Sequence, residues 1–235
     1  THKGGQIDNS GCQSCHSTTG IAGSITAAHA NETMIAGEQI SVNILSVTNT
    51  APGQFPVVKF SVTNPAAGNA FYNIKTDPAW TSGRLSLALA WDTRDFTNTG
   101  VAGRSTYATT NALTAATIAH GDGTFTVTSG VKIPDGTAAP FRAASGSGMA
   151  IFEGRYNIPT GRASFYMEPT YFSINEPNGQ AHPRRQVVAS AKCNACHGLL
   201  NFHGGSRANP EAQCQGCHNP RFATTSGISL DFKRL

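Results

Sequence analysis

The chain has 235 residues, of which only 13% are charged, and 17 Lys and Arg against 13 Asp and Glu give a formal net charge of +4. It contains no run of five or six like charges, which argues against a nucleic-acid-binding tail or a polybasic membrane anchor, and no apolar stretch of about 18 residues that could span a bilayer as a helix. The N-terminal residues contain no apolar signal-peptide core, so we expect any export signal to have been removed or to lie upstream.

Residues 1–35 form the first predicted segment and contain a Cys-x-x-Cys-His motif made of Cys12, Cys15 and His16. This spacing is that of the c-type haem attachment sequence, in which two thiols bind covalently to the porphyrin vinyl groups and the adjacent imidazole binds the iron. The segment is rich in Gly, Ser and Asn and poor in large apolar side chains. We therefore expect loops and short helices that wrap one haem.

Residues 36–180 are predicted to form a mainly β domain, an antiparallel split barrel or sandwich. Apolar residues alternate with polar ones in several runs, Pro and Gly turn signals separate the runs, and no segment of ten residues has convincing helical periodicity. The seven or eight expected strands contain residues 40–44, 58–62, 71–74, 85–91, 125–127, 149–152, 163–167 and 171–174.

The β domain contains no residue set that suggests catalysis. Asp122, Asp135 and Glu168 are isolated carboxylates, which we interpret as residues of solvated loops. Met149 and Met167 lie in strand-like runs, where core packing is a better interpretation than iron ligation.

Residues 181–235 are predicted to form a dihaem segment of loops and short helices. Two further Cys-x-x-Cys-His motifs occur there, each able to attach one haem. Their residues are Cys193, Cys196 and His197, then Cys214, Cys217 and His218. Because few residues separate the two motifs, we expect their haems to be near neighbours.

The cysteine pairs allow three interpretations other than three covalently attached haem c groups. A zinc ribbon is compatible with the 17 residues between Cys196 and Cys214, but it leaves the first pair without a partner and gives no reason for three trailing histidines. A thioredoxin-like redox motif needs only one such pair in a βαβ context. Disulfides between residues three apart would be poor cross-links.

An iron that carries electrons without binding oxygen needs a sixth ligand, and His and Met are the usual choices. Five histidines lie outside the motifs, so bis-histidine iron is the simplest hypothesis. We expect His203 and His29 to be distal ligands, with His2 and His182 as further candidates. His120 begins a His-Gly-Asp-Gly turn, so we interpret it as a loop residue.

Four stretches near the C-terminus occur in a characteristic order. They are RRQVV at 184–188, KCNACH at 192–197, HGGSR at 203–207 and CQGCHNP at 214–220. This arrangement resembles the outer-membrane decahaem cytochromes of the OmcA/MtrC family. The resemblance implies a split β-barrel that precedes a pentahaem domain, with residues 172–175 in the last barrel strand.

The resemblance also implies that the first motif and His29 correspond to the end of a preceding haem domain. Two features differ from the family. The barrel lacks the Cys-x₈-Cys pair that family members commonly carry, and the chain stops at Leu235, before a stretch that has further histidines in the family. We therefore expect either a fragment of a longer cytochrome or a trihaem relative, in which His182 or a neighbouring subunit supplies a ligand.

The expected function is electron transfer by an exported multihaem protein rather than enzymatic catalysis. The resemblance implies a place at the outer-membrane surface or outside the cell, with the periplasm as an alternative. It also implies delivery of respiratory electrons to minerals, soluble metals or flavins, with other cytochromes or a second copy as redox partners. Two alternatives remain open: a haem enzyme with one open iron site that reduces a small substrate, and a β-sandwich binding module with incidental haems.

Overall fold

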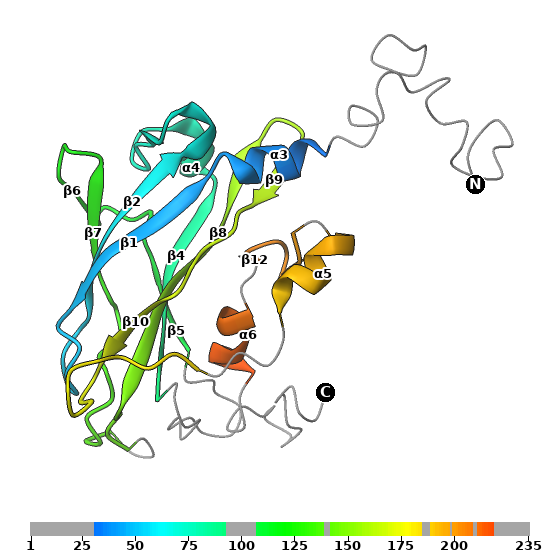
Figure 1. Ribbon diagram of the computed structural model, residues 1–235. Helices are drawn as coiled ribbons and strands as arrows, with labels where there is room; N and C mark the ends of the chain where they lie inside the picture. Colours follow the sequence, from blue (N-terminus) through cyan, green and yellow to red (C-terminus); the bar gives the residue numbers. More distant parts are fainter. Residues whose placement is uncertain are drawn as a thin grey trace, which may run out of the picture.

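The structure is a computed structural model that describes residues 31–92, 107–138, 142–184, 189–197, 199–208 and 211–218, with backbone only at 195–197. Most of the described chain is antiparallel β-sheet with a few short helices (Figure 1). This confirms the predicted mainly β fold class. The predicted first segment lies almost wholly outside the described residues, and the domain boundaries at residues 35 and 180 stay a prediction.

One five-stranded sheet, called sheet A here, contains the first strands of the chain. Its hydrogen-bonded order is β1-β2-β7-β6, and β3 also pairs with β2. The strands are β1 (Ser41–Thr48), β2 (Val57–Asn64), β3 (Ala70–Phe71), β6 (Ile118–Ala119) and β7 (Thr124–Thr128). Apolar residues at alternate positions of β2 and β7 face the same side, which is why these strands form and bury one face.

The second five-stranded sheet, called sheet B, contains the longest strand. Its order is β10-β8-β4-β5, and β9 pairs with β8. The strands are β4 (Arg84–Trp91), β5 (Ala108–Asn111), β8 (Ser147–Ile158), β9 (Gly161–Ser164) and β10 (Thr170–Ser173). All pairings in both sheets are antiparallel.

The core of the β domain lies between the two sheets. Phe60 on β2 and Phe152 on β8 are both buried, and their ring centres are 4.4 Å apart. At one side the sheets meet, because β1 contacts β8 and β10 and the Thr50 hydroxyl donates to the Ser173 carbonyl over 2.8 Å. The result is a barrel that is closed along this edge.

The described part of the β domain also contains three short helical segments. They are α3 (Glu32–Glu38), the 3-10 helix η1 (Pro65–Ala67) and α4 (Pro78–Thr81). Helix α3 begins after Asn31, whose side chain accepts hydrogen bonds from the backbone of Thr33 and Met34, and the helix packs on β9. Gly37 permits this contact, because a Cβ there would lie 2.0 Å from the carbonyl oxygen of Ser164.

The C-terminal elements lie outside sheet B, on the face turned away from sheet A (Figure 1). They are α5 (Ser190–His197), β11 (Asn201–Phe202), β12 (Arg207–Ala208) and α6 (Glu211–Cys217). Strand β12 contacts β8, and α6 contacts β4. Among the described helices, none combines the length and apolarity needed to cross a membrane.

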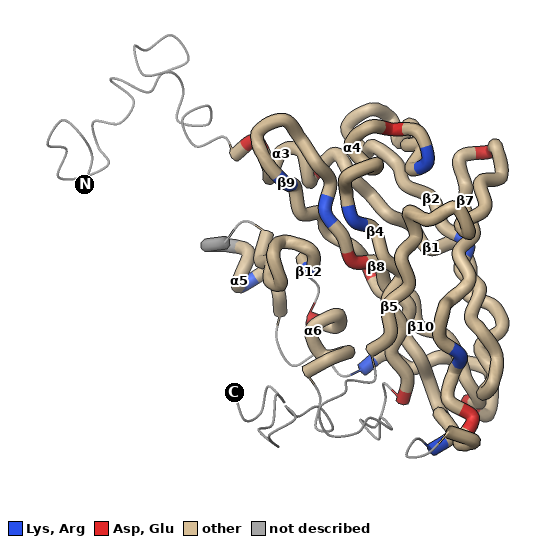
Figure 2. Tube along the Cα trace, turned by 180° about the vertical axis from the view of Figure 1, so that it is seen from behind, with Lys and Arg blue, Asp and Glu red and all other residues tan. Residues whose placement is uncertain are grey.

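These C-terminal elements change the burial of sheet B. The sequence pattern of β4 predicted one buried and one exposed face, but every residue of β4 after Arg84 is buried. The outward-facing Ser86, Ala88 and Ala90 lie under the C-terminal elements instead of in solvent. Seen from behind, charged residues are sparse, and basic segments of β4, β8 and β9 lie beside one acidic segment of β8 (Figure 2).

Candidate haem-binding site

Helix α6 carries the third Cys-x-x-Cys-His motif. Cys214 and Cys217 are three residues apart, so both thiols lie on one face of the helix, about one turn from each other. The His218 N–H donates to the Cys214 carbonyl over 2.8 Å, which continues the helical hydrogen-bond pattern and puts His218 on the same side. Burial raises the pKa of the Cys214 thiol, and Glu211 adds to this effect.

Close packing places α6 against the β domain. Gly216 faces sheet B, and a Cβ at this position would lie 3.0 Å from Tyr107 Cδ2 and 3.2 Å from Met149 Cε. Gln213 Nε2 donates to the Tyr107 hydroxyl over 3.3 Å and lies 3.5 Å from the Phe152 carbonyl oxygen. The motif helix is therefore fixed to the strand that contains Met149 and Phe152.

The β11–β12 hairpin carries His203 at its turn. His203, Gly204 and Gly205 all have positive φ angles, of 54°, 70° and 78°. Two consecutive glycines permit this left-handed backbone, whereas His203 adopts it with a side chain attached. The turn brings the His203 ring to 6.3 Å from the His218 ring, centre to centre, with 31° between the ring planes.

The separation of these two imidazoles fits a shared iron. Two imidazoles on opposite sides of one metal have ring centres about 6 Å apart, because each nitrogen lies about 2.0 Å from the metal and roughly 1.1 Å from its ring centre. Burial, Arg207 and His218 together lower the pKa of His203, which favours the neutral imidazole that binds metals. The two cysteines of α6 and these two histidines are therefore residues that could hold one haem c.

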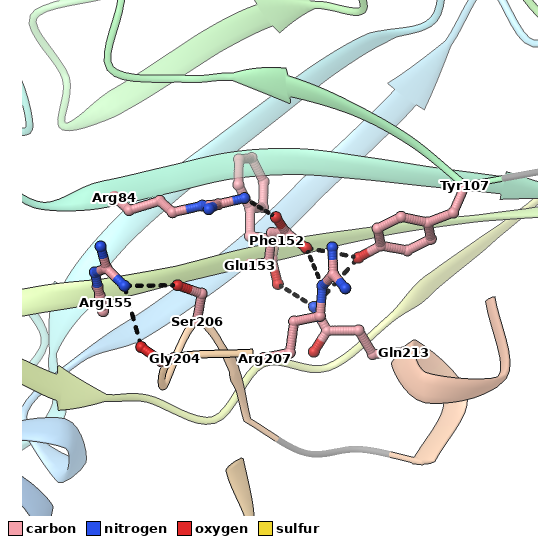
Figure 3. A network of polar contacts seen from close by, with 9 residues as sticks. All are labelled: Arg84, Tyr107, Phe152, Glu153, Arg155, Gly204, Ser206, Arg207 and Gln213. Carbon is pink, nitrogen blue, oxygen red and sulfur yellow. Dashed lines mark hydrogen bonds and ion pairs between the residues drawn. The ribbon is translucent and has the colours of Figure 1, made fainter. Parts of the chain in front are cut away.

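Four consecutive residues after His203 each make a hydrogen bond to sheet B. The Arg155 guanidinium donates to the Gly204 carbonyl over 3.1 Å, and the Ser164 hydroxyl donates to the Gly205 carbonyl over 2.7 Å. The Gly154 N–H donates to the Ser206 carbonyl over 2.8 Å. The Arg207 guanidinium donates to the Glu153 carboxylate over 2.7 Å. These bonds fix the hairpin to the middle of β8 and to the end of β9, and Figure 3 shows those of Arg155 and Glu153.

Glu153 is the centre of the polar network between the barrel and the C-terminal elements (Figure 3). Its carboxylate is fully buried, and it accepts from Arg84 Nη2 at 2.5 Å and from Arg207 Nε at 2.7 Å. The Tyr107 hydroxyl donates to the same carboxylate over 3.2 Å, and the Arg207 guanidinium lies 5.3 Å above the Tyr107 ring. Burial and the charge of Glu153 raise the pKa of Tyr107 well above its usual range.

The second motif lies on α5, next to α6. Cys193 is half-buried, and the side chains of Cys196 and His197 lie outside the described residues. The Ser190 hydroxyl donates to the Glu211 carboxylate, and the Glu211 N–H donates back to Ser190 Oγ over 3.3 Å. The first residues of the two motif helices are therefore joined.

A cavity of about 760 Å³ lies beside β10 and is lined by both motif helices. The same three helix positions contribute from each: Ser190, Ala191 and Asn194 of α5, and Glu211, Ala212 and Gln215 of α6.

The other predicted site residues fall into two groups. The first lies outside the described residues and contains Cys12, Cys15, His16, His2 and His29. In the second group, His182 is half-buried and its N–H donates to Ser147 Oγ over 2.8 Å, and His120 lies in the β6–β7 turn with Nε2 2.7 Å from Thr126 Oγ1. Met149 and Met167 are both buried, and Met149 packs against Gly216 of α6.

Sequence reasoning missed the residues that hold the site together, namely Glu153, Arg207, Tyr107 and Gln213. One signal was available for Glu153. It is a charged residue directly after the apolar run of residues 149–152, and a charge there needs a buried partner. The identity of its partners could not be read from the sequence, because Arg207 and Tyr107 lie 54 and 46 residues away.

The arrangement defines a class of protein: a β barrel that holds Cys-x-x-Cys-His helices on the outer face of one sheet. Residues 185–235 match the family of the outer membrane cytochrome MtrC/MtrF-like domains II/IV. Two solved structures are similar to the chain. MtrC from Shewanella baltica OS185 has a TM-score of 0.52 and 16% identity, over 80% of this chain and 31% of its own.

The second similar structure is the outer membrane decaheme cytochrome OmcA, with a TM-score of 0.50 and 17% identity, over 83% of this chain and 32% of its own. No curated protein matches the sequence. The chain thus shares the β fold of both cytochromes and spans about a third of the length of each. The family match and this fold confirm the resemblance to the OmcA/MtrC cytochromes that the C-terminal stretches predicted.

Proposed function

We propose that this chain is an electron carrier with three covalently attached haem c groups and bis-histidine iron. The observation that supports the proposal most directly is the pair His203 and His218, whose rings are 6.3 Å apart beside the helical Cys214 and Cys217. Two imidazoles at this separation can complete the coordination of one haem iron, which leaves no coordination position for a substrate. Such a centre transfers electrons instead of binding a small molecule.

Each predicted residue has one role in this proposal. Six cysteines attach the haems: Cys12, Cys15, Cys193, Cys196, Cys214 and Cys217. The three motif histidines His16, His197 and His218 are the proximal ligands. His203 is the distal ligand opposite His218, and His29, His2 and His182 are the candidates for the other two irons.

The chain's own residues would set the properties of the His203–His218 centre. A bound haem iron supplies a site that gains or loses one electron. Helix α6, held by Gln213 and Gly216, positions the thiols and the proximal imidazole. The hairpin, held by the middle of β8 and the end of β9, positions the distal imidazole. Because the site is prearranged, little movement accompanies a change of charge.

The wider proposal follows the family resemblance. The chain would work in extracellular respiratory electron transfer, at the outer-membrane surface or outside the cell. Its acceptors would be metal oxides, soluble metals or flavins, and its partners other cytochromes or a second copy. Its parts would be a monohaem segment at 1–35, a β domain at 36–180 and a dihaem segment at 181–235. No enzymatic activity is needed for this role.

The mass of the protein tests the number of haems. After production in a host that attaches c-type haem, the intact mass should exceed the polypeptide mass by three haem groups. Spectra of the oxidised protein should show low-spin haem throughout. A protein that contains zinc and no covalent haem would overturn the proposal.

Substitution of His203 tests the ligand pair. In His203→Ala one haem should become high-spin and bind carbon monoxide, and its potential should rise because a strong imidazole donor is lost. The matched control is His120→Ala, which removes a histidine from the far β6–β7 turn and should leave every haem low-spin. A fully low-spin His203→Ala protein would show that His203 is not a ligand. Carbon monoxide binding by the unaltered protein would favour the haem-enzyme alternative.

A further inference from the structure

Strand β8 of the barrel contacts both halves of the candidate haem site. On the distal side, Glu153, Gly154 and Arg155 bond to three of the four residues that follow His203. On the proximal side, the Phe152 carbonyl lies within hydrogen-bond distance of Gln213 of α6. The spacing between the distal and proximal histidines is therefore set through one short stretch of a barrel strand.

Within this stretch, Glu153 joins the two halves through side chains. Its carboxylate accepts from Arg207, which lies four residues after His203, and from the Tyr107 hydroxyl. The Tyr107 hydroxyl in turn accepts from Gln213, one residue before Cys214. A continuous chain of hydrogen bonds thus runs from the distal hairpin to the proximal helix, and Glu153 is at its centre (Figure 3).

We propose that Glu153 is a positioning residue that holds His203 at the distance from His218 that one iron requires. This inference rests on the proposed function, because it assumes that these two histidines share an iron. Glu153 acts through Arg207 and the hairpin and does not touch the iron itself. The barrel is then the part of the molecule that determines whether the sixth coordination position is closed.

The cost of burying Glu153 supports this role. A fully buried carboxylate loses its hydration, and it is tolerated only when charged and polar partners surround it. Two guanidiniums and one phenol satisfy this carboxylate. An apolar residue at position 153 would suit a buried strand better, so the carboxylate has a purpose beyond packing. Fixing Arg207, and with it the hairpin, is the purpose that the contacts indicate.

The geometry makes the iron ligation sensitive to this contact. His203 already adopts a positive φ, so the hairpin must be held for the imidazole to face His218. Residues that orient a metal ligand from outside the coordination sphere typically change metal affinity 10- to 100-fold when they are replaced. We expect the same range for the binding of the His203 imidazole to the iron.

Glu153→Gln is the first test, made on the complete haem-loaded chain. The amide keeps the shape and loses the charge, so the pair with Arg207 weakens. We expect His203 binding to fall by about 10- to 100-fold, seen as partial high-spin signal from one haem and new carbon monoxide binding. The control is Asp92→Asn, which alters another buried carboxylate, one that accepts from the Ser145 N–H over 2.6 Å.

Arg207→Gln is the second test, and it separates positioning from charge. Removing Glu153 takes away a negative charge and removing Arg207 takes away a positive one, so a purely electrostatic role would shift the haem potential in opposite directions. A positioning role instead gives high-spin signal in both variants. The double variant should lose little more than either single one, because the two residues act as a unit. If the Glu153→Gln protein does not accumulate in the host, Arg207→Gln alone tests the positioning role.

The outcomes distinguish the two proposals. If His203→Ala becomes high-spin while Glu153→Gln and Arg207→Gln stay low-spin like Asp92→Asn, the positioning role is wrong and the ligand assignment stands. If His203→Ala itself stays low-spin, the ligand assignment has failed and the positioning role fails with it. High-spin signal in both variants, absent from the control, supports the proposal.

Discussion

At the scale of single residues, packing among aromatic side chains raises the pKa of one tyrosine, Tyr156. Tyr156 on β8 packs against Trp80 and Tyr72, with ring centres 5.2 and 5.8 Å away. Burial, the charge of Asp77 and the neighbouring Tyr72 raise the pKa of Tyr156 to about 12. The phenol therefore stays protonated in the folded protein at a pH where the unfolded chain has lost the proton.

This shift predicts a loss of stability in alkali. Above pH 10 the unfolded state binds fewer protons than the folded state, so the free energy of unfolding falls as pH rises from about 10 to about 12. In Tyr156→Phe this part of the loss should disappear, because no proton is left to differ between the states. Denaturant midpoints at pH 8 and pH 11 measure the effect. An unchanged alkaline loss in the variant would contradict the prediction.

The sequence predicts site residues where one short pattern carries the chemistry. Cys214, Cys217 and His218 are predicted because their spacing is that of haem attachment, and His203 is predicted because it lies between two motifs. Glu153 and Tyr107 were missed because their importance depends on contacts across 46 or more residues. Local patterns cannot encode such contacts, so only the fold shows them.

At the scale of elements, close backbone approach fixes α3 to β9. The Gly37 position has no room for a side chain, since a Cβ would lie 2.0 Å from the Ser164 carbonyl oxygen. Ser164 also holds the Gly205 carbonyl of the distal hairpin. Helix α3, which follows the first Cys-x-x-Cys-His motif, and the β11–β12 hairpin, which precedes the third, are therefore both docked on β9.

Gly37→Ala should destabilise the protein even though alanine favours helices. The helix propensity gain is at most about 1 kcal/mol, while forcing a methyl group into a filled position typically costs about 1–3 kcal/mol. The strand backbone cannot retreat without losing its pairing with β8, so we expect the cost to dominate. Chemical denaturation measures the change.

Gly130→Ala is the matched control for this substitution. Its added Cβ would have its nearest contact at 3.6 Å, from Thr110 Oγ1, and Gly130 does not need a positive φ. We expect a change within about 0.5 kcal/mol. Equal stabilities of the two alanine variants would mean that α3 moves freely on β9.

The strands themselves show which patterns a sequence reveals. Strands β1, β2, β4 and β7 were predicted because their apolar residues alternate and pack in the core. The expected strand at 71–74 is wrong beyond Phe71, because Asn73 accepts from the Lys75 N–H and starts a turn. Strands β5 and β6 were missed, since both are short and their residues are mostly exposed or only half-buried.

At the scale of the whole molecule, the barrel and the C-terminal segment differ in what fills their interiors. The barrel has a continuous apolar core between its sheets, made from its own side chains. In the described part of the C-terminal segment, the side chains of α5 are half-buried or exposed, and the side chains that α6 buries are Gln213, Gln215 and Cys217. Haem would supply the missing apolar surface there, so the two parts should depend on the cofactor to different degrees.

A chain that cannot attach its third haem tests this division. In Cys214→Ser/Cys217→Ser we expect the amides of β4 and β8 to keep their protection from hydrogen exchange, because Leu87 and Phe152 of these strands are buried in the apolar core that the barrel makes from its own side chains. The amides of α6 and of the β11–β12 hairpin should lose protection, because no haem then bridges His203 and His218. Exchange measured by mass spectrometry on the variant and on the unaltered protein gives both answers at once. If β4 and β8 lost protection together with α6, the barrel would need the haem to fold, and the barrel could not be the rigid support that the Glu153 network requires.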